Sequence, residues 1–207
     1  MVKKNKDKEA LLLQSFEILK TNLEDNESKI QEIIAKIAKI NTSLAIEMWK
    51  FVLTNGESMI KKDGYSFTSG MLYQLERKIG NEEVIIILNE NNDILEYVYG
   101  KSNSIYASYI WDALKYGYLE LAEKMYVLVK KNRYKEESLS SIVEEICESF
   151  ANEFEYIHDV DEDEDEENNE EDELRANEVA SILLKWVSAL KNKEAKARIS
   201  VTLIDYI

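Results

Sequence analysis

The chain has 207 residues, 45% of them hydrophobic, and a formal net charge of −15 at pH 7. The hydrophobic content excludes a wholly disordered protein, and the length allows one domain with a substantial core, or two small domains as the alternative. No apolar run is long enough to span a bilayer. A secretory signal is not expected either, because Gln14, Ser15 and Glu17 interrupt the apolar stretch near the N-terminus.

Proline is absent from the sequence, and only six glycines occur. Because proline interrupts helices, its absence favours helices that follow one another through short turns. We therefore predict an all-α fold, an irregular stack of antiparallel helices in the form of an α-α superhelix or a multi-helix bundle. Residues 1–207 are expected to form a single domain.

The first half of the chain has apolar residues at helical spacing, which predicts helices near 8–23, 30–37, 44–53 and 72–79, with a polar loop at 57–66. Asn41 is a candidate cap before the third helix, and Gly80 suits the position just after the fourth. Residues 84–99 fit either two short helices or a β-hairpin, since the continuous apolar run 84–88 satisfies both patterns. We expect helices, because Glu82 and Glu83 suit a first helical turn.

The second half predicts helices at 102–117, 119–129, 139–150, 179–190 and 195–207. The first of these is apolar or aromatic nearly all round and is expected to be the central, buried helix. Tyrosine and tryptophan concentrate between residues 97 and 126, and their spacing favours a role in the core. If some of them are exposed, Tyr109, Tyr116 and Tyr118 are the candidates for a partner-binding surface.

The stretch Ala113 to Val129 resembles the joint between the two helices of a tetratricopeptide repeat, over less than a tenth of the chain. The proline that is characteristic of that repeat is absent, and no second copy is visible. The sequence therefore indicates a helical, repeat-like stack and assigns no family.

One segment carries most of the negative charge. Residues 159–173, DVDEDEDEENNEEDE, contain 12 carboxylates and no cation, which leaves a net charge of only −3 for the rest of the chain. We call this segment the acidic tract. Such a block repels itself and cannot bury apolar surface, so we expect a disordered acidic loop inserted between helices.

The acidic tract matches part of the pattern of a calcium-binding EF-hand loop. Asp159, Asp161, Asp163 and Glu170 occupy positions 1, 3, 5 and 12 of an EF-hand count. Position 6 is Glu164, where the sharp turn of that loop needs glycine. No metal site and no cofactor is therefore expected.

Standard catalytic motifs are missing from the sequence. It has no glycine-rich phosphate loop, GxSxG or HExxH, and His158 is the only histidine. Cys147, the only cysteine, lies among apolar residues and is expected to be a buried, inert thiol, which also favours a reducing, cytoplasmic location. No catalytic residue is assigned, and the chain is not expected to be an enzyme.

The expected function is binding of a basic macromolecule, steered by the acidic tract. The expected protein is a non-enzymatic protein-binding module or inhibitor, and an immunity protein that masks a cationic toxin is one form of it. The alternatives are a structural or scaffold subunit with a passive acidic linker and, third, an enzyme of unrecognised type. No membrane contact is expected, and direct nucleic-acid binding is disfavoured because the only basic cluster is Lys3 to Lys8. The candidate partner-binding residues are Asp161, Glu162, Asp163, Glu164, Asp165, Glu166, Glu167, Tyr109, Tyr116 and Tyr118.

Overall fold

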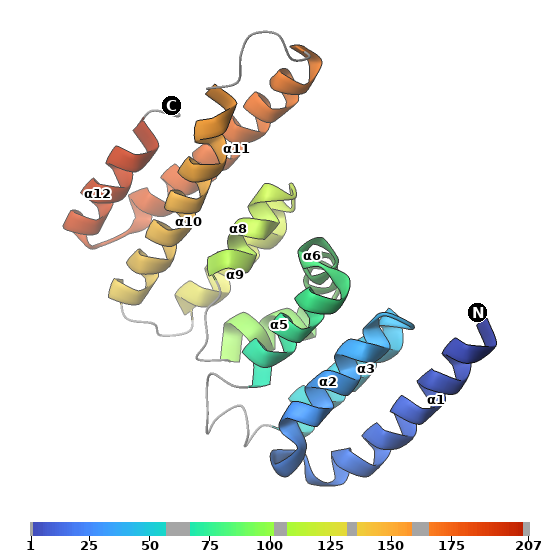
Figure 1. Cartoon of the computed structure of the whole chain (residues 1–207). Helices are drawn as coiled ribbons and strands as arrows, with labels where there is room; N and C mark the ends of the chain where they lie inside the picture. The colour runs from blue at the N-terminus through green and yellow to red at the C-terminus, as the bar shows by residue number, and fades with distance from the viewer. Residues whose placement is uncertain (1, 57–66, 102–106, 132–135, 159–165, 205–207) are drawn as a thin grey trace. The chain divides into compact units, whose positions relative to one another are not determined.

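Helices make up nearly all of the computed structural model, which describes residues 2–56, 67–101, 107–131, 136–158 and 166–204 (Figure 1). No strand occurs in these ranges, so the all-α prediction is confirmed. The chain divides into two compact units, Met1–Ser104 and Ile105–Ile207, and each is described by itself. The expectation of a single domain stays a prediction.

The first unit is organised around α2, which contacts α1, α3 and α5. The stripe that the sequence predicts is confirmed, because Ile30, Ile34 and Ile37 of α2 are fully buried. The elements of the first unit are α1 (Val2–Leu19), the short 3-10 turns η1 (Lys20–Asn22) and η2 (Glu24–Asn26), α2 (Glu27–Ala38), α3 (Thr42–Asn55), α5 (Phe67–Ile79), α6 (Asn81–Glu90), α7 (Asn92–Leu95) and the π-helical segment η3 (Glu96–Lys101).

Residues 84–99 are helical, as expected, and lie in α6, α7 and η3. Val84, Ile85, Ile87 and Leu88 are all buried, which explains why their pattern has no polar face. The choice of helices over a β-hairpin is therefore confirmed.

Three single residues explain two helix ends and one tight helix contact in this unit. The Asn41 side chain accepts a hydrogen bond from the Leu44 backbone N–H at 3.2 Å and so caps α3, as the sequence predicts. Gly80 ends α5 with φ at +93°, a conformation that side chains with a Cβ disfavour. Gly70 of α5 lies so close to α2 that an added Cβ would approach the Gln31 side chain to 2.6 Å.

The second unit is organised around α10, which contacts α8, α11 and α12. The sequence favoured 102–117 as the central helix; within this unit α10 has that place, because its apolar residues are buried against three neighbours. The elements are α8 (Ala107–Lys115), α9 (Leu119–Lys131), α10 (Glu136–His158), α11 (Glu166–Ala189) and α12 (Lys193–Leu203).

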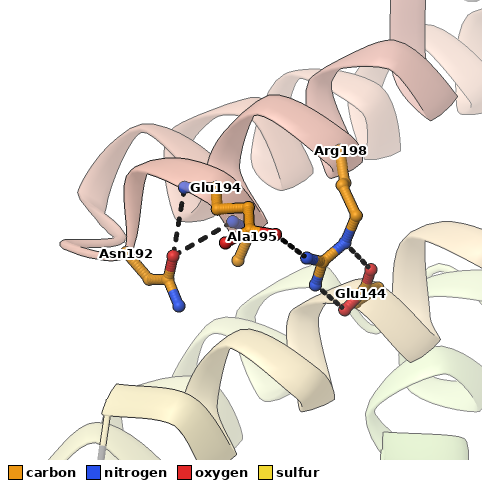
Figure 2. A network of polar contacts seen from close by, with 5 residues as sticks. All are labelled: Glu144, Asn192, Glu194, Ala195 and Arg198. Carbon is orange, nitrogen blue, oxygen red and sulfur yellow. Dashed lines mark hydrogen bonds and ion pairs between the residues drawn. The ribbon is translucent and has the colours of Figure 1, made fainter.

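Two polar contacts fix α12 in this unit (Figure 2). The Asn192 side chain accepts hydrogen bonds from the backbone N–H groups of Glu194 and Ala195, each at 3.1 Å, and caps the helix. Arg198 donates two hydrogen bonds to Glu144 of α10, from Nε at 2.9 Å and from Nη2 at 3.0 Å. These bonds hold the Glu144 pKa below its ordinary value.

The acidic tract is divided by the start of α11. Residues 159–165 lie outside the described residues, whereas the backbone of residues 166–173 forms the first two turns of α11. Carboxylates in a first helical turn interact favourably with the positive end of the helix dipole, so Glu166 and Glu167 suit this position. Residues 166–173 of the tract are thus the beginning of α11, whose later residues pack in the second unit.

Candidate functional site

The turn between α8 and α9 presents two of the candidate tyrosines. Gly117 adopts φ of +79°, its N–H donates to the Leu114 carbonyl at 3.1 Å, and the Tyr118 N–H donates to the Ala113 carbonyl at 2.8 Å. This pair of bonds is the Schellman motif that ends many helices at glycine. It fixes the backbone from which the side chains of Tyr116 and Tyr118 project.

Two long side chains hold this turn against the neighbouring helices. Arg175 of α11 donates a hydrogen bond from Nη1 to the carbonyl of Lys115 at 3.3 Å. Lys115 Nζ in turn lies 2.6 Å from Glu153 Oε1 of α10. The turn is thereby tied to the first half of α11 and to α10.

The contact with Arg175 joins the tyrosine turn to the part of α11 that follows the acidic tract in the sequence. Arg175 is two residues after Glu173, the last residue of the tract, and the residue between them, Leu174, is 64% exposed. Tyr116, which follows the acceptor residue Lys115 in the chain, is 36% exposed. We call Tyr116, Leu174 and the acidic tract together the acidic end of the second unit. It combines exposed apolar side chains with a dense negative charge.

The sequence-predicted site residues are only partly brought together. Asp161, Glu162, Asp163, Glu164 and Asp165 lie outside the described residues, and Glu166 and Glu167 form the start of α11. Tyr116 is exposed and Tyr118 is half-buried.

Tyr109 is a correction: the sequence names it as a surface candidate if some of the aromatic residues are exposed, but its side chain is only 5% exposed. Helix α8 packs against both α9 and α10, so two of its faces are covered and Tyr109 belongs to the core. The core assignment is confirmed for Tyr99, Trp111 and Tyr126, which are also buried.

The residues that sequence reasoning missed are Lys115, Leu174 and Arg175. A signal was present for Arg175, which is the only Lys or Arg between residues 136 and 184. A lone cation that directly follows a run of carboxylates is a candidate for a structural contact. Its acceptor, a backbone carbonyl 60 positions away, has no signal in the sequence.

Cys147 is a buried thiol, as the sequence predicts. It is 1% exposed, and burial, with smaller contributions from Glu148 and Glu144, raises its pKa to about 12. His158 lies eleven residues further along the same helix, roughly 16 Å away along the axis at 1.5 Å per residue. The two residues therefore do not form a nucleophile and base pair.

Among the described residues, no group of three or more His, Cys, Asp or Glu side chains is placed to hold a metal ion. In the same part of the chain, no helix has the length and apolar character needed to cross a membrane. No protein-family model, curated protein or solved structure matches the chain.

Proposed function

We propose that the chain is a non-enzymatic protein-binding module that docks a basic partner on the acidic end of its second unit. An inhibitor that masks a cationic protein, as immunity proteins do, is one form of this function. The proposal extends to a cytoplasmic location, which the single buried thiol favours. The observation that carries the proposal is the hydrogen bond from Arg175 to Lys115, which joins the tyrosine turn to α11, the helix whose first residues belong to the tract.

The charge distribution supports a local electrostatic site. Residues 105–207 contain 12 Lys and Arg against 25 Asp and Glu, a net charge of −13, and the tract supplies −12 of it. The rest of the second unit is therefore almost neutral. A charge concentrated in this way attracts a cationic surface toward one end of the unit and raises the encounter rate at low salt.

Charge alone gives little specificity for one partner. We expect the exposed apolar residues to provide that specificity. Leu174 and Tyr116 lie where a partner guided by the tract would make contact. Aromatic and aliphatic anchors surrounded by charged residues are typical of protein-binding surfaces. The partner that fits is a basic segment with an apolar face, such as an amphipathic helix rich in lysine and leucine.

The test is fluorescence anisotropy with two labelled peptides of equal positive charge, one an amphipathic helix of leucine and lysine and the other of lysine and serine. We expect the full chain to bind the leucine peptide more tightly. Leu174→Ser should weaken that binding about tenfold, since burying a leucine is worth about 1.5–3 kcal/mol and 1.4 kcal/mol is a factor of ten. Val201→Ser, which removes an equally exposed side chain from α12, is the matched control and should leave the affinity unchanged.

The charge is tested by replacing every Asp and Glu of residues 159–173 with Asn and Gln, which keeps the length of the segment. Binding of the leucine peptide should weaken and lose most of its dependence on salt. Equal affinity for both peptides, or salt-insensitive binding that survives this replacement, would contradict the proposal. The second result favours the scaffold alternative, in which the tract is a passive linker.

A further inference from the structure

A second surface of this unit, the groove between α9 and α11, has a different character. It contains a pocket of about 180 Å³ lined by Glu123, Tyr126, Val127, Lys130, Lys185, Trp186 and Ala189. The four α9 residues recur at helical spacing, so they lie on one face of that helix. The two helices run in the same direction, because Glu123 and Tyr126 of α9 contact Lys185 and Trp186 of α11 in that order. Lys115, which precedes α9, contacts Arg175 earlier in α11.

The floor of the groove is formed by two stacked aromatic rings. The rings of Tyr126 and Trp186 are stacked, with centroids 4.4 Å apart and planes inclined by 7°. Both side chains are buried, whereas Val127 at the rim is 41% exposed. A volume of about 180 Å³ is below the several hundred cubic ångströms of typical small-molecule sites and suits one apolar side chain.

The rim of the groove is positively charged. Lys185 Nζ lies 2.6 Å from Glu123 Oε1, so these two charges offset one another across the groove. Lys130 lines the pocket together with Val127 and Ala189, and no ion pair joins it to another side chain that the structure describes.

We propose that the groove between α9 and α11 docks an acidic peptide segment of a partner protein, which inserts one apolar side chain over Tyr126 and Trp186 and pairs a flanking carboxylate with Lys130. An apolar side chain fits the volume and lining of the pocket, and a carboxylate beside it complements the charge of the rim. This second site does not depend on the proposed docking of a basic partner at the acidic end.

The acidic tract does not prevent such binding. Trp186 follows Glu173 by thirteen residues of α11, roughly 20 Å at 1.5 Å per residue. The Debye length is about 8 Å at physiological salt, so repulsion from the part of the tract that lies in α11 is largely screened at the groove. The second unit can thus bind a basic partner at its acidic end and an acidic peptide in the groove between α9 and α11.

The proposal is tested by nuclear magnetic resonance on the full chain, through the indole N–H signals of its three tryptophans. Trp186→Phe assigns the signal of Trp186. The probe is an acetylated and amidated peptide with the sequence Asp-Glu-Leu-Asp-Glu, and the expected result is a saturable shift of the Trp186 signal at up to millimolar peptide. Replacing the peptide's leucine by serine should weaken the binding about tenfold, as expected for a lost buried leucine.

Lys130→Glu should weaken binding of the leucine peptide about fivefold, a change of roughly 1 kcal/mol. Lys131→Glu is the matched control, because the next residue of the same helix does not line the pocket, and it should leave the affinity unchanged. Dispersed indole signals in both variants show that they fold. The proposal is overturned by a Trp186 signal that does not saturate, by an equal response to Lys-Arg-Leu-Lys-Arg, or by unchanged affinity in Lys130→Glu.

Discussion

Arg175 of α11 donates a hydrogen bond from Nη1 to the backbone carbonyl of Lys115, 3.3 Å away. This contact joins a turn that presents Tyr116 to a helix that begins in the acidic tract. The tyrosine turn is therefore bonded to the same helix, two residues beyond the last carboxylate of the tract.

Removing the Arg175 side chain should loosen this junction. We expect Arg175→Ala to lower the free energy of unfolding by about 0.5–1 kcal/mol, as for an exposed hydrogen bond, and to weaken binding of the leucine and lysine peptide. Lys193→Ala, an exposed cation of α12, is the control. Urea denaturation and peptide anisotropy measure the two effects, and full peptide affinity in Arg175→Ala would show that the junction is irrelevant to docking.

A second prediction concerns the contact between α2 and α5. A Cβ at Gly70 would approach the Gln31 side chain to 2.6 Å, and Gln31 is buried and donates to Glu27 Oε1 at 3.2 Å. Alanine is favoured over glycine in helices by about 1 kcal/mol, so the steric cost and the helix propensity oppose one another in Gly70→Ala. In a Gln31→Ala background only the propensity remains, and Gly70→Ala should stabilise the chain.

The double-mutant cycle of Gly70→Ala and Gln31→Ala isolates this interaction. We expect a coupling of about 1 kcal/mol or more in the free energy of unfolding, as is common for residues in direct contact. Strictly additive effects would mean that the two side chains do not compete for the same space.

The Cys147 thiol should be almost unreactive in the folded chain. Its pKa of about 12 compares with an ordinary value of 9.0, so the thiolate that reacts is roughly a thousandfold scarcer near neutral pH. Alkylation by iodoacetamide, followed by mass spectrometry, should be slower in the native chain than in urea by at least that factor. Similar rates in both states would show that the thiol is accessible.

The pair formed by Glu144 and Arg198 should make stability sensitive to acid. The hydrogen bond from Arg198 lowers the Glu144 pKa below its ordinary value of 4.5, because it stabilises the charged carboxylate of the folded chain. This contribution is fully present above pH 4.5 and is lost as the pH falls through the lowered pKa. Glu144→Gln should therefore be less stable than the native chain near neutral pH and should approach it in acid.

The control for this effect is Glu148→Gln, which removes an exposed carboxylate of the same helix. Thermal unfolding followed between neutral pH and pH 3 gives the comparison. A stability difference between Glu144→Gln and the native chain that is independent of pH would contradict the role assigned to the ion pair.

Local patterns predicted most of the helices, because the burial of Ile30, Ile34 and Ile37 and the cap at Asn41 depend on residues a few positions apart. Tyr109 was named as a surface candidate, but burial there is decided by α9 and α10, which close over α8 from different parts of the chain. The same limit applies to the acidic end. The tract and Tyr116 were candidates from composition, but the hydrogen bond of Arg175 that joins the turn of Tyr116 to α11 spans 60 positions.

The central claim is that the acidic tract and the exposed apolar residues beside it act as one docking surface. The most direct test is to titrate the isotope-labelled full chain with the leucine and lysine peptide and to follow its backbone amide signals. We predict that the signals of Tyr116, Gly117, Leu174 and Arg175 shift together with those of residues 159–173 and saturate at the same peptide concentration. Shifts confined to residues 159–173 would contradict the claim.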